Sequence, residues 1–204
     1  LYCAIRIRYG GHTTWGYFAL CGLFTAWTVA NEMVAVLFAV ALTGLLFRSH
    51  PRQTLKFFLP PAVLVGAAYL YTTYISTGGL LPYYLYFKTD YYQYEGSYWL
   101  TPRGIDAANE PKWFYLFNLL LGHHGVFSLT PVFLIAFFGM VQRKPAMEAI
   151  QRLGLFLSVG LLIFYTFKTN NYGGVCQGAR WLFWLIPFWL ISLAPVVDQH
   201  FHSP

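Results

Sequence analysis

The chain has 204 residues, of which 57% are hydrophobic, 21% aromatic and 10% charged, and its formal net charge is +6. Soluble domains carry about 25% charged residues, so this composition excludes an ordinary water-facing surface. Nucleic-acid binding is not indicated either, because the basic residues form short clusters between apolar segments and not a stripe along a soluble module.

The chain begins at Leu1, without an initiator methionine or a signal-peptide pattern, and its first residues resemble the end of a preceding helix. We therefore expect residues 1–204 to form a single transmembrane domain, as a fragment that lacks its N-terminal part. The predicted helices then belong to the later part of a longer membrane protein.

Five apolar segments follow one another along the chain, and together they contain no lysine or arginine and one acidic residue, Glu32. They comprise residues 14–47, 57–76, 125–141, 153–167 and 181–197. A helix needs roughly 20 apolar residues, with about 17 as the short limit, to cross the hydrocarbon core of a bilayer. The predicted fold class is all-α: a polytopic bundle of transmembrane helices with a long, aromatic-rich extracytoplasmic loop.

The first apolar segment is too long for one crossing, since a helix of its length would extend about 50 Å against a core of roughly 30 Å. Asn31 and Glu32 lie at its middle, where a carboxylate inside the membrane would cost several kcal/mol. The sequence therefore predicts two helices, 14–29 and 33–47, with a turn at the membrane surface or in a water-filled cavity. Thr13 or Thr14 is expected to cap the first of them.

Prolines mark the starts and bends of the later helices. Pro60 and Pro61 favour a helix that starts there, because proline is tolerated in the first turn. Pro131, Pro187 and Pro195 lie inside predicted helices and are expected to kink them.

Alternation of the spans sorts the charges onto two sides. One side carries eight basic residues in short segments: Arg6, Arg8, Arg48, Arg52, Lys56, Arg143, Lys144 and Arg152. The positive-inside rule makes this side cytoplasmic, so the loops 77–124 and 168–180 face outward. Five of the seven acidic residues then lie on the outer side: Glu32, Asp90, Glu95, Asp106 and Glu110. Polar chemistry is expected on that face.

The first outer loop contains an aromatic run, PYYLYFKTDYYQYEGSYW, with seven tyrosines, one phenylalanine and one tryptophan. This composition is too aromatic for a solvated, disordered tail. The run is either an aromatic belt at the level of the lipid headgroups or a stacking surface for a sugar or an isoprenoid chain. In the second interpretation Asp90 and Glu95 supply hydrogen-bond acceptors.

The end of the same loop predicts a short helix from Lys112 to Leu121, which lies in the membrane interface, with Asn109 as its N-cap. Asp106 and Glu110 are four residues apart, but a solvated loop explains them better than an acid/base pair.

Adjacent histidines, His123 and His124, follow at the start of the next span. Neighbouring side chains point in different directions on a helix, so metal chelation by this pair is not expected. The pair has either a hydrogen-bonded structural role or donates to a phosphate or hydroxyl of a substrate. The cysteines Cys3, Cys21 and Cys176 have no metal-binding spacing either, and no metal or other cofactor is predicted.

The second outer loop, KTNNYGGVCQGARW, contains glycines that permit a tight turn with exposed backbone N–H groups. Arg180 follows at the start of a span, where its guanidinium and the helix dipole favour an anion. Either a substrate phosphate or the phosphate of a lipid headgroup fits this position.

Three segments carry a resemblance to a known family. The second outer loop and the helix after it, NNYGGVCQGARWLFWLIPFWL, resemble a YGG-and-GxR segment of polytopic bacterial glycosyltransferases of the GT-C superfamily. These are relatives of the protein O-mannosyltransferases and the lipid A aminoarabinose transferases. Similarly, GLFTAWTVANEMVAVLFAV looks like the paired short helices of that superfamily, and GHHGVFSLTPVFLIAFFGM like its loop-to-helix transition.

The resemblance implies transfer of a sugar from a polyprenyl-phosphate carrier to an acceptor at the outer face of a bacterial cytoplasmic membrane. Arg180 corresponds best to the site of the carrier phosphate, with Lys168 or His123 as helpers. The expected substrate-binding residues are Arg180, His123, His124, Asn171, Tyr172, Lys168, Glu32, Asp90 and Glu95. Glu32 is either a second carboxylate near the cavity or only a residue of the helix turn.

The family's catalytic acid lies in its first outer loop, and nothing in this sequence matches it. The catalytic residue is therefore unknown, and the fragment alone is expected to be inactive even if the parent protein is an enzyme. A divalent metal occurs in some family members, but this sequence does not support one. Two other classes stay open, a transporter and a non-catalytic membrane scaffold protein, although the internal repeats typical of many transporters are not seen.

Overall fold

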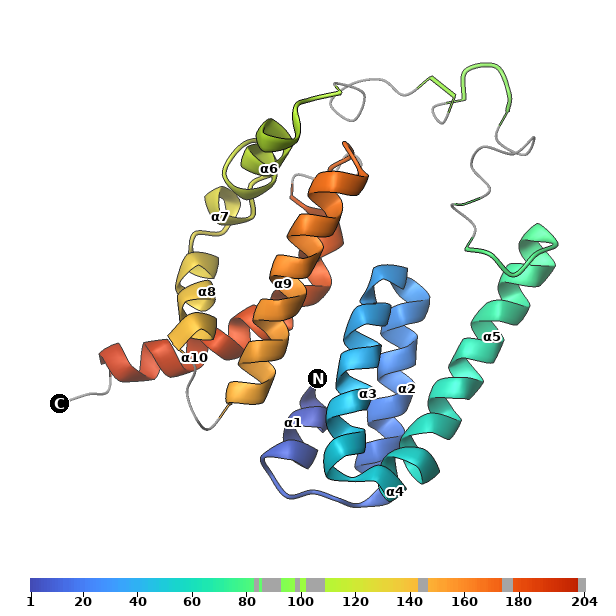
Figure 1. Cartoon of the computed structure of the whole chain (residues 1–204), viewed down its shortest axis with the longest axis vertical. Helices are drawn as coiled ribbons and strands as arrows, with labels where there is room; N and C mark the ends of the chain where they lie inside the picture. The colour runs from blue at the N-terminus through green and yellow to red at the C-terminus, as the bar shows by residue number, and fades with distance from the viewer. Residues whose placement is uncertain are drawn as a thin grey trace. The chain divides into compact units, whose positions relative to one another are not determined.

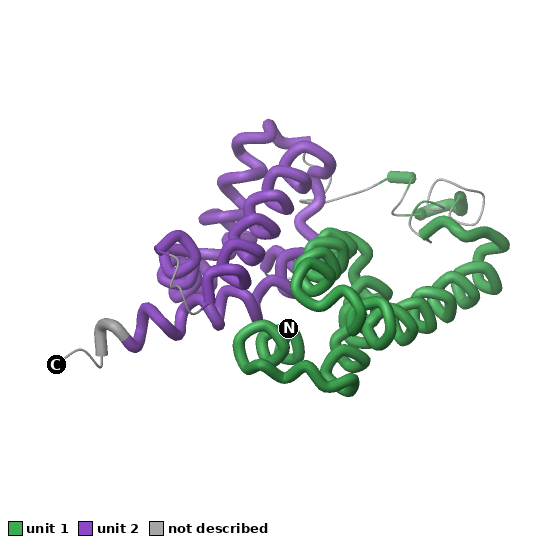
Figure 2. The backbone as a smooth tube through the Cα atoms, turned by 60° about the horizontal axis from the view of Figure 1, so that its bottom comes forward, with its two compact units in different colours: residues 1–103 green, residues 104–204 purple. Residues whose placement is uncertain are grey.

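The computed structural model describes residues 1–82, 85, 93–97, 100–101, 109–142, 147–173 and 178–201. Every regular element in these residues is a helix, which confirms the all-α class. Contacts within the chain divide it into two compact units, residues 1–103 and residues 104–204 (Figure 2). In the described part of the chain, three helices are long and apolar enough to cross a membrane: Pro51–Thr77, Glu148–Lys168 and Arg180–Asp198. The prediction of one single domain stays a prediction.

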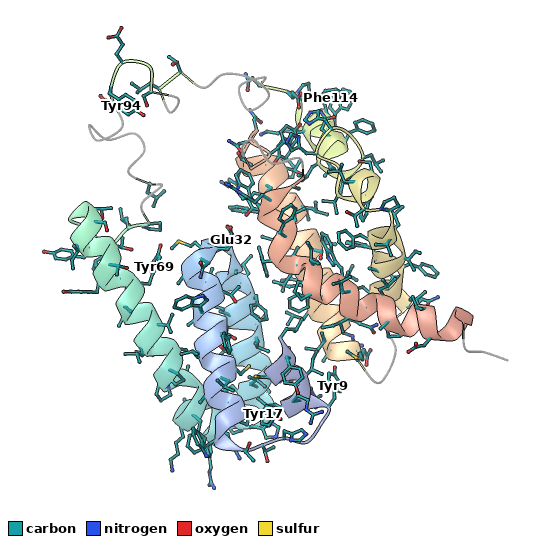
Figure 3. All side chains as sticks on the ribbon, turned by 180° about the vertical axis from the view of Figure 1, so that it is seen from behind. Tyr9, Tyr17, Glu32, Tyr69, Tyr94 and Phe114 are labelled. Carbon is teal, nitrogen blue, oxygen red and sulfur yellow. The ribbon has the colours of Figure 1, made fainter. Side chains whose placement is uncertain are left out.

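Unit 1 begins with a helical hairpin, drawn in blue in Figure 1. Its elements are α1 (Tyr2–Arg8), α2 (Trp15–Asn31), the 3₁₀ turn η1 (Met33–Ala35) and α3 (Val36–Ser49). Glu32 interrupts the helix with extended backbone angles, φ −136° and ψ 98°, at the tip of the hairpin (Figure 3). The predicted break at Asn31 and Glu32 is therefore confirmed. Thr14 is the N-cap of α2, but its side chain makes no capping hydrogen bond.

The helix Pro51–Thr77, which follows this hairpin, starts earlier than predicted, at Pro51 and not at Pro60. It consists of α4 (Pro51–Gln53), a π-helical segment η2 (Thr54–Phe58) and α5 (Leu59–Thr77). Pro60 and Pro61 cannot donate to the carbonyls one turn earlier, and their rings crowd that turn. The wider π-helical turn immediately before them accommodates both prolines, so the helix continues through a position that the sequence suggested as a start.

Close approach of α2 to this helix requires a glycine. A Cβ atom on Gly22 would lie 2.0 Å from the carbonyl oxygen of Phe58. Small residues let apolar helices pack with their backbones in near contact, which is a common way to join helices where no water drives them together.

Unit 2 contains α6 (Lys112–Leu120), α7 (Val126–Leu129), α8 (Val132–Gln142), α9 (Glu148–Lys168), the 3₁₀ segment η6 (Arg180–Leu185) and α10 (Ile186–Phe201). The predicted helix 125–141 is not continuous. Pro131 breaks it after Thr130, whose angles are φ −140° and ψ 76°, because the residue before a proline avoids the helical region. The remaining apolar helix, α8, is therefore shorter than a full crossing requires. The kinks expected at Pro187 and Pro195 stay predictions.

Buried polar groups join the long helices of unit 2. The indole N–H of Trp189 donates to Ser158 Oγ at 2.9 Å, and this hydroxyl donates to the carbonyl of Gly154 at 2.7 Å. A Cβ atom on Gly139 would lie 2.2 Å from the carbonyl oxygen of Ser192, so α8 and α10 are in near contact. These contacts pack α8, α9 and α10 against one another.

Candidate functional site

The polar residues of unit 2 gather at one end, which comprises residues 109–125, residues 168–173 and the start of η6. Here the segment before α6 is joined to the segment after α9. Lys112 Nζ donates to the carbonyl of Thr169 at 3.1 Å and to Asn170 Oδ1 at 2.7 Å. Asn170 Nδ2 donates in turn to Asn109 Oδ1 at 3.0 Å. We call this region the polar end of unit 2.

The sequence-based role of Asn109 was wrong. The N-cap of α6 is Pro111, and Asn109 lies outside the helix with φ 48°. Asparagine adopts this left-handed conformation more readily than most residues. Here its side-chain oxygen accepts a hydrogen bond from the other segment and does not cap a helix.

An aromatic stack lies at the centre of the polar end. The ring of Tyr172 is stacked between Tyr115 at 4.6 Å and His124 at 4.8 Å, with interplanar angles of 26° and 14°. His123 meets the same ring edge-on at 4.8 Å. Tyr115 is fully buried and its hydroxyl donates to the carbonyl of Asn171 at 2.9 Å. The stack fixes the first residues of the glycine-containing loop on α6.

One carboxylate lies beside this stack. Tyr172 Oη donates to Glu110 Oε2 at 2.5 Å, and Asn118 Nδ2 donates to the same oxygen at 3.3 Å. Hydrogen bonds to a carboxylate are stronger than those between neutral groups, so Oε2 is held firmly. The other oxygen, Oε1, has no hydrogen-bond partner among the described residues, and Glu110 is half-buried. One acceptor is thus fixed and the other is open.

The two histidines contact each other, contrary to the expectation that they point apart. They lie in the turn before α7 and not on a helix, with their Nδ1 atoms 2.5 Å apart. One Nδ1 must donate and the other must accept, so at least one imidazole is neutral and the pair carries at most one positive charge. His123 is exposed, whereas His124 is buried. Among the described residues, no group of three or more potential metal ligands occurs.

Gly173 brings Arg180 next to the stack. Its φ of 105° is a conformation that favours glycine, and a Cβ atom there would lie 3.1 Å from the Cβ of Arg180. The N–H of Gly173 donates to Asn171 Oδ1 at 2.6 Å, which fixes this turn. Residues 174–177 of the loop lie outside the described residues.

Two exposed cations at the polar end have no ionic partner. Arg180 begins η6 and Lys168 ends α9, and neither forms an ion pair or a hydrogen bond within the described part of the chain. Lys112 bonds only to neutral oxygens. The described residues of this end thus include three cations and one carboxylate, that of Glu110. The local balance is positive and favours an anion.

Six of the nine predicted site residues lie at this polar end: Arg180, His123, His124, Asn171, Tyr172 and Lys168. The other three belong to residues 1–103, outside unit 2. Glu32 is a half-buried residue of the hairpin turn in unit 1, and Glu95 is exposed in a turn after α5. Asp90 and most of the aromatic run lie outside the described residues. The two interpretations of the run, an aromatic belt or a stacking surface, stay predictions.

Sequence reasoning missed four residues that build the site: Glu110, Lys112, Tyr115 and Asn118. A signal was present, because Tyr115 and Asn118 are three residues apart and therefore share one face of an otherwise apolar helix. Tyr172 stacks on Tyr115 and donates to Glu110. It is 62 residues from Glu110 in the sequence, and no local pattern connects the two.

Within its described residues, the polar end thus combines one open carboxylate oxygen, a histidine pair that shares a proton and two cations without an ion pair. Such a set can accept a hydrogen bond from a hydroxyl and attract a phosphate at the same time. No family model, curated protein or solved structure matches this chain. The functional interpretation therefore depends on the chemistry of these residues.

Proposed function

We propose that the chain is part of a multi-pass glycosyltransferase of the bacterial cytoplasmic membrane, which moves a sugar from a polyprenyl-phosphate carrier to an acceptor at the outer face. In this proposal the polar end of unit 2 binds the phosphate head of the carrier. Arg180 and Lys168 attract the phosphate, and Glu110 accepts a hydrogen bond from a hydroxyl of the sugar or the acceptor.

The observation that carries the proposal is the separation of charges at this end. Among the described residues, Glu110 is held by the neutral donors Tyr172 and Asn118 and not by a cation. Arg180 and Lys168 likewise form no ion pair within this part of the chain. A guanidinium without a carboxylate partner offers two parallel N–H donors, which match a phosphate group.

The surface below the polar end supports a lipid-linked ligand over a soluble one. The last turns of α9 expose Ile163, Phe164 and Phe167, with Phe167 69% exposed, directly before Lys168. An amphiphile with a phosphate head and an isoprenoid tail matches this arrangement, in which a cation lies next to exposed apolar side chains. A soluble sugar phosphate has no apolar group that could contact these exposed side chains.

Binding of farnesyl phosphate to the full chain in detergent micelles tests the proposal, with farnesol as the uncharged control. We expect farnesyl phosphate to bind and Arg180→Ala to weaken its binding by about tenfold or more, since a hydrogen bond to a charged group contributes about 1.5–3 kcal/mol. Arg152→Ala is the matched control, because Arg152 is an exposed arginine of the same unit that pairs with Glu148. Equal binding of farnesol and farnesyl phosphate, or an unchanged affinity in Arg180→Ala, would contradict the proposal.

A further inference from the structure

We propose that one end of unit 1 is a binding surface for the phosphate headgroups of anionic phospholipids. This surface is formed by α1, the loop 9–14, the last turn of α3, α4 and η2, and we call it the basic end of unit 1. It carries five cations: Arg6, Arg8, Arg48, Arg52 and Lys56. The inference does not depend on the proposed glycosyltransferase activity.

None of these cations forms an ion pair with a carboxylate among the described residues. Residues 1–31 and 33–89 contain no aspartate or glutamate. The one acidic residue between them, Glu32, lies at the far tip of the hairpin, whereas Tyr17 lies at the basic end (Figure 3). Five positive charges on one end of a small unit produce a strong field for anions.

The structure brings these segments together even though they are up to 50 residues apart in sequence. Arg6 in α1 contacts His12, whose ring lies 5.0 Å from Tyr17 in the first turn of α2. On the same end, the ring of Phe18 meets His50 edge-on at 5.7 Å, directly before α4. The segment α1, the first turn of α2 and the end of α3 therefore form one surface. This surface continues into α4 and η2.

Arg6 keeps its full positive charge in this arrangement. One of its Nη atoms lies 2.6 Å from His12 Nε2. A guanidinium can only donate, so His12 accepts at Nε2, is neutral, and cannot offset the charge. The positive charge of Arg6 has no carboxylate partner among the described residues and therefore attracts a phosphate.

The start of α2 adds to the attraction. Its N-cap, Thr14, makes no side-chain hydrogen bond, so the first N–H groups of this 17-residue helix are not capped by a side chain. The helix dipole also places partial positive charge at this point. Both features favour an anion beside Arg6 and His12.

Exposed aromatic and apolar side chains next to the cations identify the ligand as a lipid and not a soluble phosphate. Trp15 is 67% exposed, Tyr2 66% and Leu55 53%. Tryptophan and tyrosine prefer the level of the lipid headgroups, where one end of the ring is apolar and the other is wet. Cations beside such residues match a membrane surface that carries anionic lipids.

The test measures lipid binding to the purified full chain in detergent, with phosphatidylglycerol and phosphatidylcholine of identical acyl chains as probes. We expect a preference for phosphatidylglycerol that falls as salt is raised. Arg52→Gln should weaken phosphatidylglycerol binding about fivefold, and Arg48→Gln combined with Arg52→Gln and Lys56→Gln about a hundredfold, since each surface cation contributes about 1 kcal/mol. All three side chains are exposed, so these variants are expected to fold, which circular dichroism checks.

Arg152→Gln is the matched single-charge control, because this exposed arginine pairs with Glu148 and should leave the affinity unchanged. Equal binding of the two lipids would overturn the inference, as would an equal effect of Arg152→Gln and Arg52→Gln. Soluble glycerol phosphate is the last arm of the test. If it displaces phosphatidylglycerol at equal concentration, the surface is a site for free phosphate esters and the assignment to a lipid is wrong.

Discussion

The hydrogen bond between Tyr172 and Glu110 is expected to be among the strongest single contacts at the polar end of unit 2. Tyr172→Phe removes only the hydroxyl that donates to Glu110 Oε2 at 2.5 Å and keeps the stacked ring. A hydrogen bond to a charged group contributes about 1.5–3 kcal/mol, against about 0.5–1.5 kcal/mol for a neutral pair. Tyr115→Phe is the matched control, because its hydroxyl donates at 2.9 Å to a neutral carbonyl in the same stack.

The free energy of unfolding, measured by titration with sodium dodecyl sulfate in mixed micelles, compares the two variants. We expect Tyr172→Phe to lower it by about 1 kcal/mol more than Tyr115→Phe does. In a Glu110→Gln background the acceptor is neutral, so the cost of Tyr172→Phe should fall to the neutral range and reveal the coupling of the pair. If Tyr172→Phe costs the same in both backgrounds, the carboxylate does not hold this loop and the description of the site is wrong.

Three further predictions concern backbone contacts and the cross-link between segments. Gly22→Ala should lower the free energy of unfolding by about 3 kcal/mol or more, because its Cβ would lie 2.0 Å from a backbone oxygen, whereas Gly16→Ala, with open space around it, should not destabilise the chain. Gly173→Ala should weaken farnesyl phosphate binding, because its φ of 105° and the contact with Arg180 both resist a side chain; unchanged binding would show that this turn does not position the guanidinium. Lys112→Met should speed hydrogen exchange in residues 169–173 but not in the middle of α9, since it removes both bonds to the segment after α9.

The helices could largely be predicted from the sequence because their signals are local. The polar pair Asn31 and Glu32 in a segment too long for one crossing predicted the hairpin turn, and the structure places the break there. The start of the helix Pro51–Thr77 was missed, because Pro60 and Pro61 on their own resemble a helix start. The helix continues through the two prolines by a π-helical turn before them, which no local sequence pattern predicts.

The candidate site was predicted in part, and the missing part has a physical reason. Arg180, Lys168 and the histidines stand out because charge and imidazole groups are rare in this chain. Glu110 did not stand out, since a carboxylate in a loop is usually solvated. Its role depends on a bond to Tyr172 that forms only when α6 packs on α9. Contacts of this separation are not encoded in any local pattern.

The way Glu110 is satisfied explains why the polar end of unit 2 suits an anion that also carries hydroxyl groups. Had Arg180 or Lys168 paired with this carboxylate, that cation would have been neutralised locally and the attraction for an anion would be weaker. The tyrosine and asparagine donors that bond to the carboxylate are neutral and do not change its charge. The carbonyl oxygen that accepts from Lys112 is also neutral, so Lys112 keeps its positive charge. The acceptor and the cations consequently act independently. A phosphate is attracted by the cations while the open carboxylate oxygen stays available to a hydroxyl on the same ligand.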